Sequence, residues 1–279
     1  MKYYLRKLLF FKNFEKYVKK RIFLVIIYSK KIFDNFFNYT VMNQNKDFKS
    51  IPIIIVSFNQ LYYLKQLIDF LNNNNYTNIV IIDNNSTYKP LLDYFETIES
   101  SVTLHRLKEN VGHSVFWQNK ELFDKYSKGY YVVTDPDIVP LKECPGDFVL
   151  HFKKILDKNF RITKVGFSLK IDDIPDSNLN KQKVIDWESQ FWINENKDGD
   201  FISKIDTTFA LYRPYCKYDK NSFFDAIRTK FPYQAIHGGW YLDSKNLTEE
   251  QFFYFSSCNK SSSWRINEEG EMQNKNIYN

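Results

Sequence analysis

Short apolar runs alternate with helical patterns over residues 51–140. The runs at 51–56 and 79–82 are continuous and rich in β-branched residues, as in strands that are buried on both faces of a parallel sheet. Between them, leucine and isoleucine recur at helical spacing over residues 60–71. Strand, helix and strand at this spacing predict a βαβ unit with a right-handed crossover.

Two further strands are predicted, at 102–107 and 130–133, with a helix over 114–126 between them. A polar cluster follows each of the four apolar runs, at residues 57–59, 83–86, 110–113 and 135–137. Ligands of open parallel sheets bind outside the carboxyl ends of the strands. The clusters therefore predict one ligand site at one edge of the sheet.

Beyond residue 140 the pattern is sparser. It predicts a helix at 146–158, strands at 165–169 and 206–212, and an irregular end that contains residues 231–241. We expect an α/β fold: a single domain with a mostly parallel sheet flanked by helices. The expected units are a basic N-terminal helical extension (1–48), the domain itself (49–257, with two halves at 49–140 and 141–257) and a polar tail (258–279).

The N-terminal extension is basic and aromatic. Ten lysines and arginines lie within residues 2–31, with Glu15 as the single acid, whereas the whole chain carries a net charge of +6. Its apolar run at 22–28 is too short to cross a bilayer, which takes about 20 residues. The pattern favours an interfacial helix on an anionic membrane surface, and a basic helix packed on the body or on a partner is the alternative. No nucleic-acid reader motif accompanies the charge, so nucleic acid is not an expected partner.

The three cysteines, Cys144, Cys216 and Cys258, are widely separated and form no CxxC pair. Neither a disulfide framework nor a zinc module can be derived from them. A reducing compartment fits best, and with the basic segment it predicts a cytoplasmic protein that is peripheral on the inner face of the cell membrane.

Asp135-Pro136-Asp137 is the most informative triplet. Two carboxylates at the end of a buried strand can hold a divalent cation, Mn²⁺ or Mg²⁺, that bridges the oxygens of a diphosphate. An Asp-x-Asp by itself is common as a pair of turn carboxylates. Its position after an apolar strand, downstream of two βα units, favours the metal site.

The earlier strand ends offer candidate donor-binding groups. Asp83, with Asn85 in the same polar cluster, can accept a hydrogen bond from a uracil-type base or from ribose hydroxyls, although the cluster is also typical of a helix cap. Ser57 and Asn59 offer polar groups beside the base, and a simple turn after the first strand explains them almost as well.

Four motifs occur in a characteristic order: Val56-Ser-Phe-Asn59, Asp83-Asn-Asn-Ser86, Glu109-Asn-Val-Gly112 and Asp135-Pro-Asp137. In that order and spacing they resemble the GT-A-fold glycosyltransferases, particularly the bacterial family 2 type, over residues 51–140. The resemblance implies a GT-A-like domain with a nucleotide-binding sheet, in which residues 49–140 form the donor-binding half and residues 141–257 form the acceptor-binding half. It implies a nucleotide-diphosphate-sugar donor, a UDP-sugar above all, and a glycan or lipid-linked acceptor. It implies Asp83 towards the base, Asp135 towards the ribose and Asp137 on the metal. Asn110 and Gly112 match an element that closes the donor site.

An inverting transfer needs a general base, for which Glu188 and Asp206 are the candidates. Glu188 lies among aromatic residues that suit sugar stacking, and Asp206 begins the predicted strand at 206–212. Each can equally be an exposed acid or a local cap. The Glu-Asp pair that often supplies the base in family 2 is not recognisable downstream. His237 is a candidate for the metal or the diphosphate, and a packed core histidine is the alternative.

Two other functions compete with a glycosyltransferase. A sugar-phosphate nucleotidyltransferase needs a glycine-rich loop with a cation after its first strand, and residues 57–61 contain neither. A non-catalytic, membrane-attached nucleotide-sugar-binding module is the other, and the intact Asp135 and Asp137 argue against it. A P-loop enzyme is excluded because GxxxxGK[ST] is absent.

Overall fold

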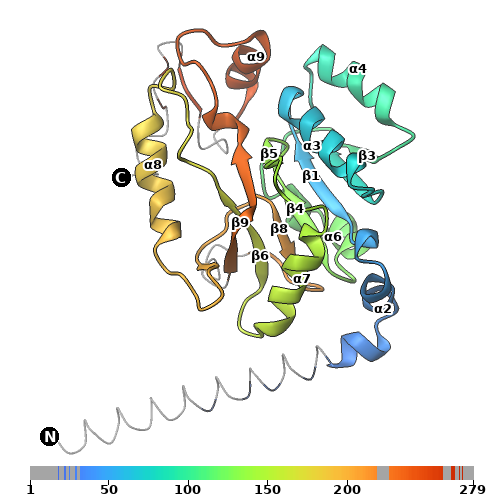
Figure 1. The fold of residues 1–279 in the computed structure, drawn as a ribbon. Coiled ribbons are helices and arrows are strands. Elements are labelled where there is room, and N and C mark those ends of the chain that lie inside the picture. The colour runs from blue at the N-terminus through green and yellow to red at the C-terminus, as the bar shows by residue number, and fades with distance from the viewer. Residues whose placement is uncertain are drawn as a thin grey trace, which may run out of the picture.

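The computed structural model describes residues 32–218, 226–259, 265–267, 270 and 272, together with residues 18, 22, 25 and 29. Within these residues a nine-stranded sheet has the order β3-β2-β1-β4-β8-β6-β9-β5, and β7 pairs with β9 (Figure 1). The strands are β1 (Ile53–Ser57), β2 (Ile79–Asp83), β3 (Thr103–Arg106), β4 (Tyr131–Thr134), β5 (Ile138–Pro140), β6 (Lys164–Leu169), β7 (Phe201–Ile202), β8 (Ala210–Tyr212) and β9 (Ala226–His237).

The first four strands form the parallel part of the sheet. Strand β1 lies between β2 and β4, with Ile54 in register with Val80 on one side and with Val133 on the other. All residues of β1, β2 and β4 are buried, which explains why these runs are apolar throughout. Ser57 and Asp83 are in register, so the polar clusters after these strands meet at one edge of the sheet, as the sequence predicts.

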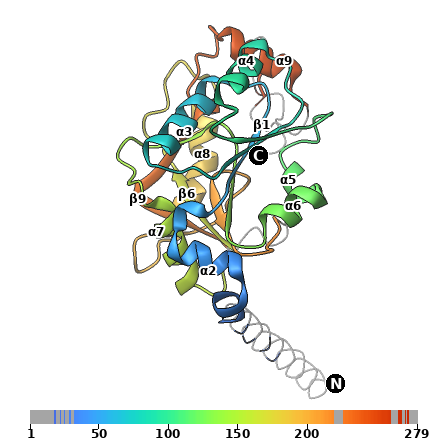
Figure 2. The ribbon, with the colours of Figure 1, turned by 90° about the vertical axis from the view of Figure 1, so that its right-hand side faces the viewer.

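Helices cover both faces of this sheet (Figure 2). On one face, apolar residues of α3 (Tyr62–Asn73), α4 (Lys89–Ile98) and α7 (Phe148–Lys158) pack in one core with Ile53 and Ile55 of β1. On the other face, α5 (Val115–Gln118) and α6 (Lys120–Tyr126) pack against Ile54 and Val56. The predicted α/β class with flanking helices is confirmed.

The single helix predicted over residues 114–126 is divided in two by Asn119. Asn119 has an extended backbone conformation, and its side chain accepts a hydrogen bond from the Leu122 amide. Asparagine is a preferred N-cap, so it ends α5 and starts α6 at the same position. Helical spacing alone did not reveal this break.

The second half of the sheet is mixed. Strand β8 is antiparallel to both β4 and β6, whereas β9 is parallel to β6 with an irregularity between Phe167 and Ser168. The prediction of an irregular segment at 231–241 is wrong, because β9 continues to His237 before the short helix η4 (Gly238–Trp240). The predicted strand at 206–212 is too long at its start, since β8 begins at Ala210.

The C-terminal helix α9 (Glu249–Ser257) was not predicted. A capping box between Thr248 and Gln251 begins it. Glu250 accepts hydrogen bonds from the amides of Leu61 and Tyr62 at the start of α3. Both views accordingly show α9 beside α4, at the end of the molecule where the polar clusters lie (Figures 1 and 2).

The chain before β1 is partly described. Residues 32–37 are helical and lead into α2 (Tyr39–Lys46) and the short helix η1 (Phe48–Ser50). The Gln44 side chain bonds both the amide and the carbonyl of Tyr130, which holds α2 against the start of β4. Most of the predicted interfacial segment, and most of the tail after residue 258, lie outside the described residues. None of the helices in the described ranges is long and apolar enough to cross a bilayer.

Candidate functional site

A cavity of about 750 Å³ opens at the carboxyl edge of the parallel strands. One side is lined by residues that follow β1 to β4, including Phe58, Asn84, Asn110 and Asp135. The opposite side is lined by residues from α8 (Lys181–Ser189), the segment before β8, β9, η4 and α9. The position agrees with the rule for open parallel sheets.

Asp137 and His237 meet at the centre of this edge. His237 Nδ1 lies 3.2 Å from Asp137 Oδ2, yet the nitrogen lacks the alignment of a hydrogen bond to any described residue. The amides of Gly238 and Gly239 donate to the carbonyl and to Oδ2 of Asp137 at 2.7 Å and 3.0 Å. Burial opposes ionisation of both side chains, but their mutual attraction outweighs it, so the pKa of Asp137 is lowered and that of His237 is raised.

Asp135 lies beside this pair and carries a strongly perturbed carboxyl group. The Thr207 hydroxyl donates to Asp135 Oδ2 at 3.0 Å. Burial, reinforced by the negative charge of Asp137, raises the pKa of Asp135 to about 8. Two carboxylates this close disfavour simultaneous ionisation unless a cation joins them.

The residues at this position fit a divalent cation that is shared with a ligand. No group of three or more His, Cys, Asp or Glu side chains within the described part of the chain is arranged to hold a metal alone. His237 Nδ1 is nevertheless a buried nitrogen without a hydrogen bond beside a carboxylate, and a side chain at Gly239 would crowd both groups at 3.2 Å. Mg²⁺ is commonly held by one or two carboxylates together with substrate phosphates, which matches Asp135 and Asp137.

The loop after β3 is fastened to the end of β2 by Asn84. Asn84 Nδ2 donates to Asn110 Oδ1 at 2.9 Å and to the Gly112 carbonyl at 3.1 Å, while Oδ1 accepts from the Val111 amide. Gly112 has a φ of 92°, which a residue with a side chain rarely adopts. Asn84, Asn110 and Gly112 all line the cavity, so this loop forms one of its walls.

The other predicted donor residues lie outside the cavity lining. Asp83 is buried, and its two oxygens accept from the Ser86 amide at 2.9 Å and from Arg106 Nε at 3.2 Å. Asn59 accepts from the amides of Thr87 and Tyr88, and so ties the ends of β1 and β2 together. Ser57 is fully buried at the end of β1, and Asn85 is exposed with a φ of 67°. Any contact of these four residues with a ligand stays a prediction.

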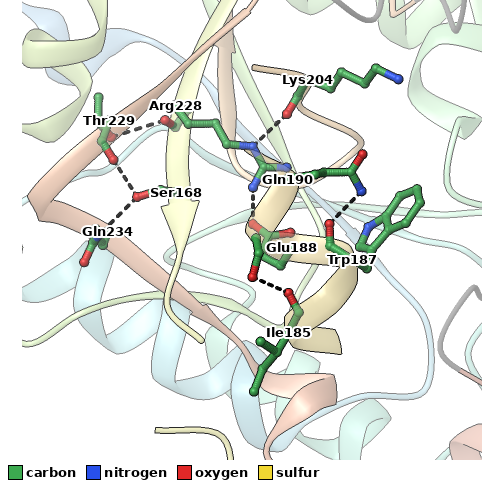
Figure 3. A network of polar contacts seen from close by, with 11 residues as sticks. Ser168, Ile185, Trp187, Glu188, Gln190, Lys204, Arg228, Thr229 and Gln234 are labelled. Carbon is green, nitrogen blue, oxygen red and sulfur yellow. Dashed lines mark hydrogen bonds and ion pairs between the residues drawn. The ribbon is translucent and has the colours of Figure 1, made fainter. Parts of the chain in front are cut away.

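Glu188 and Arg228 form a buried ion pair in the opposite wall (Figure 3). Arg228 Nη1 donates to Glu188 Oε1, and Arg228 Nε donates to the Lys204 carbonyl at 2.7 Å. Burial raises the pKa of Glu188, and the positive charge of Arg228 opposes that shift. The aromatic neighbours expected around Glu188 are present, since Trp187 and Phe191 also line the cavity.

Asp206 lines the cavity too, but its environment differs from the expected one. It precedes β8 rather than beginning a buried strand, and it is exposed. Its Oδ1 accepts a hydrogen bond from the Tyr218 hydroxyl at 2.8 Å. Asp206 is thus an exposed carboxylate, whereas Glu188 is a buried one that is paired with Arg228.

The structure therefore brings together Asn110, Gly112, Asp135, Asp137, Glu188, Asp206 and His237 around one cavity. Sequence reasoning missed Asn84, Thr207 and Arg228. Asn84 lies in the motif Asp83-Asn-Asn-Ser86, directly between the candidates Asp83 and Asn85, so this position could have identified it. Thr207 had a similar signal, because it directly follows the candidate Asp206. Arg228 carried no local signal, because the pairing of β6 with β9 brings it to the site.

No protein-family model and no curated protein matches the chain. The solved structures that it is similar to include a mannosyltransferase and S. aureus TarS. The mannosyltransferase PcManGT from Pyrobaculum calidifontis, in complex with GDP-Man and Mn²⁺, has 11% identity and a TM-score of 0.42, covering 74% of this chain and 60% of that one. S. aureus TarS 1-349 has 13% identity and a TM-score of 0.41, and the match covers 68% of this chain and 60% of that one. The chain thus spans about 60% of the length of these two structures.

Proposed function

We propose that this chain is a metal-dependent glycosyltransferase that transfers a sugar from a nucleotide-diphosphate-sugar donor to a glycan or lipid-linked acceptor. The observation that carries the proposal is the cluster of Asp135, Asp137 and His237, which faces a cavity at the carboxyl end of β4. This edge is where a nucleotide-binding parallel sheet presents its ligand.

The donor nucleoside fits the end of the cavity formed by the first half of the sheet. Phe58 and Tyr254 line it with their ring centroids 6.4 Å apart, and Asn84 and Asn110 supply amide groups beside them. Aromatic faces with a few polar groups are typical of a nucleoside site. Asp83 would contribute indirectly, because it shapes the loop that carries Asn84. A UDP-sugar is the donor that we expect.

Asp137 and His237 are the residues that would hold the cation, with Asp135 beside them. When bound, Mn²⁺ or Mg²⁺ would neutralise the charge that develops on the departing nucleoside diphosphate. The Gly239 amide fixes the orientation of the Asp137 carboxylate. Thr207 does the same for Asp135. The protein thereby supplies a preorganised site in which the diphosphate is placed before transfer.

Asp206 is the general base in this proposal. The bond between the anomeric carbon and the phosphate oxygen breaks, the acceptor hydroxyl forms the new bond, and its proton passes to Asp206. Asp206 is exposed to the cavity, and the Tyr218 hydroxyl orients it through Oδ1. Glu188 is less suited to take the proton of an acceptor, because it is buried and its Oε1 already accepts a hydrogen bond from Arg228.

Attachment to the inner face of the cell membrane is a further part of the proposal. The described residues before β1 include large exposed apolar side chains, Phe33, Phe36, Phe37 and Tyr39, each at least 59% exposed. With the ten cations of residues 2–31, this composition suits an anionic interface. Full-length protein should co-sediment with vesicles that contain phosphatidylglycerol at low salt, and a chain that begins at Lys49 should not. Equal sedimentation of both proteins would contradict this part.

Product analysis tests the activity itself. The full chain is incubated with a panel of nucleotide sugars, with and without Mn²⁺ or Mg²⁺, and the released nucleotide is identified. A glycosyltransferase releases a nucleoside diphosphate in a metal-dependent manner, whereas a nucleotidyltransferase forms pyrophosphate from a nucleoside triphosphate and a sugar phosphate. Tight nucleotide binding without any turnover would instead indicate a binding module.

A further inference from the structure

The ion pair of Arg228 and Glu188 is held rigidly in the cavity wall. The two residues are 3% and 2% exposed, and both line the cavity. Besides its bonds to Glu188 and Lys204, the guanidinium group lies over the Phe191 ring, 4.3 Å from its centroid. Figure 3 shows Arg228 reaching from β9 to Glu188, which comes from α8. The pair therefore offers fixed polar groups to whatever enters the cavity.

Stability gives no account of a charged pair at this position. Glu188 lies in the last turn of α8, where the helix dipole disfavours a carboxylate, and burial disfavours it further. A buried ion pair is often no more stabilising than apolar residues of the same volume. A polar ligand in the cavity does explain why the wall is charged here.

The charges around the cavity are unbalanced. Seven carboxyl groups line it, whereas Arg228 is the single lysine or arginine in the lining as described, and Glu188 already neutralises it. Asp135 and Asp137 belong to the donor end, and Glu250 is engaged by the amides of Leu61 and Tyr62. An anionic acceptor would therefore face carboxylates such as Asp206, with no unpaired lysine or arginine among the described lining residues to compensate its charge.

A buried hydroxyl near the pair points to a hydrogen-bonding ligand. Thr208 lines the cavity, is 8% exposed, and its Oγ1 has no hydrogen-bond partner within the described residues. Gly166 of β6 is in register with Ala210 of β8 on one side and with Arg228 of β9 on the other. Thr208 comes two residues before Ala210, so it lies in the same region of the sheet as Arg228. Buried hydroxyls in native proteins normally have a partner, so the missing one is a candidate ligand group.

We propose that Arg228, Glu188 and Thr208 form the acceptor subsite, and that the acceptor presents an uncharged, hydroxyl-bearing pyranose rather than a uronic acid or a phosphorylated sugar. Within a neutral pair, the guanidinium donates and the carboxylate accepts, which matches neighbouring sugar hydroxyls without adding net charge. Trp187 and Phe191 supply aromatic surface for the apolar face of the ring. The assignment rests on the proposed function, because that function identifies this wall as the acceptor end.

Direct binding tests the assignment. Full-length protein is titrated with the methyl glycosides of glucose, galactose and mannose and with their uronic-acid counterparts, by saturation-transfer NMR with and without Mg²⁺ and UDP. We expect the dissociation constant of at least one neutral glycoside to be about tenfold or more below that of its uronic acid. Equal or tighter binding of the acids, or no saturable binding of any neutral glycoside, overturns the proposal.

The Glu188→Gln variant separates recognition from structure. It leaves the charge of Arg228 uncompensated, so the preference should move towards the uronic acid by about tenfold. Asp186→Asn is the matched control, because it removes an exposed carboxylate from the same helix and should change neither ligand. The double variant Glu188→Gln with Arg228→Gln should lose neutral-sugar binding without gaining the acid. Thermal melting verifies that each variant is folded, and an equal loss of both ligands in folded Glu188→Gln contradicts the subsite.

Failure of this inference can be distinguished from failure of the proposed function. If nucleotide sugars are turned over but no neutral-sugar preference exists, the subsite is wrong and the transferase stands. If the preference and its shift in Glu188→Gln are observed without nucleotide turnover, the sugar subsite stands and the transferase is wrong.

Discussion

The two halves of the sheet contribute to the cavity in different ways. In the half from β1 to β4, site residues directly follow the ends of parallel strands, as Asn84, Asn110 and Asp135 do. In the half after β5, they come from the two ends of β9, the end of α8 and the segment before β8. Topology alone places the first set, whereas the second set depends on how unlike elements pack together.

The halves also differ in how their charges are balanced. Asp135 and Asp137 lie beside each other and beside the imidazole of His237, so an added cation would relieve the repulsion at this end, the proposed donor end. Glu188 in the other half has Arg228 as its permanent counter-ion. This contrast suggests that the first half binds a metal and diphosphate and that the second half binds a neutral ligand. Variants in each half should therefore affect different steps.

The largest effect is expected from Asp137→Ala. The variant removes the carboxylate that lies beside His237 and accepts from the Gly239 amide, so a cation loses a main ligand. Turnover should fall by about a thousandfold or more, and metal-dependent nucleotide affinity should fall with it. Nucleoside diphosphate release and calorimetric titration with nucleotide, each with and without Mn²⁺, measure the two quantities.

Asp93→Ala is the control for that variant. Asp93 is an exposed carboxylate on α4, paired with Lys89 on the same helix. Its removal should leave both quantities within about twofold of the parent, because exposed helix ion pairs contribute little. Near-normal turnover in Asp137→Ala would contradict the metal assignment.

Asp206→Asn should lower the rate of transfer without changing the binding of the nucleotide. As the proposed base, Asp206 should contribute about 10²–10³-fold to the chemical step, while nucleotide binding stays intact. Single-turnover transfer and equilibrium donor binding separate these effects. Asp198→Asn, an exposed carboxylate outside the cavity lining, is the matched control. If Asp206→Asn transfers at the parental rate, Asp206 is not the base, and a retaining mechanism gains support.

The first half of the fold could be predicted from the sequence because its signals are local. Buried parallel strands must be apolar throughout, and the turn after each strand must be polar, so β1, β2 and β4 were recognisable as short runs. The position of Asp135 and Asp137 at the ligand edge followed from the same topology. Asp83 illustrates the limit of this reasoning. Its pairing with Arg106 depends on the register of β2 and β3, which no local pattern specifies.

The second half could not be predicted because its decisive contacts are distant in sequence. Arg228 meets Glu188 across 40 positions, and it does so because β9 pairs with β6 while α8 packs beside them. Strand β9 contains Pro232 and a register irregularity, so its period-two pattern is interrupted. Helix α9 has a capping box but no apolar stripe, because none of its residues is fully buried.

Glu250→Ala should have a smaller effect that involves both halves. Glu250 belongs to α9, yet it accepts from the first amides of α3 and so fixes α9 over the donor end. Losing these bonds should lower the free energy of unfolding by about 1–2 kcal/mol. Because Tyr254 of α9 lines the cavity, the donor KM should rise as well. Chemical denaturation and donor kinetics measure the two effects, and Glu249→Ala on the same turn is the matched control for stability. An unchanged donor KM would show that α9 does not contribute to the donor site.

The smallest expected effect concerns Lys164, a buried cation on β6 in the second half. Its Nζ donates to the Ile205 carbonyl and lies over the rings of Tyr212 and Tyr218, and burial lowers its pKa from 10.5 to about 8. Below pH 8 the side chain is charged in both states, and the cost of burying that charge is fully present. As the pH rises from 8 towards 10.5, the folded protein loses this proton before the unfolded chain does, so the cost is relieved.

Between pH 7.5 and 9 the stability of the parent should therefore rise by about 1 kcal/mol relative to Lys164→Met, which has no titrating group there. Urea denaturation of both proteins at several pH values gives this difference, and subtraction cancels the pH-independent loss of the bond to Ile205. A difference that is constant with pH would show that Lys164 keeps its ordinary pKa. The folded protein would then stabilise the charged ammonium group of Lys164 as well as water does.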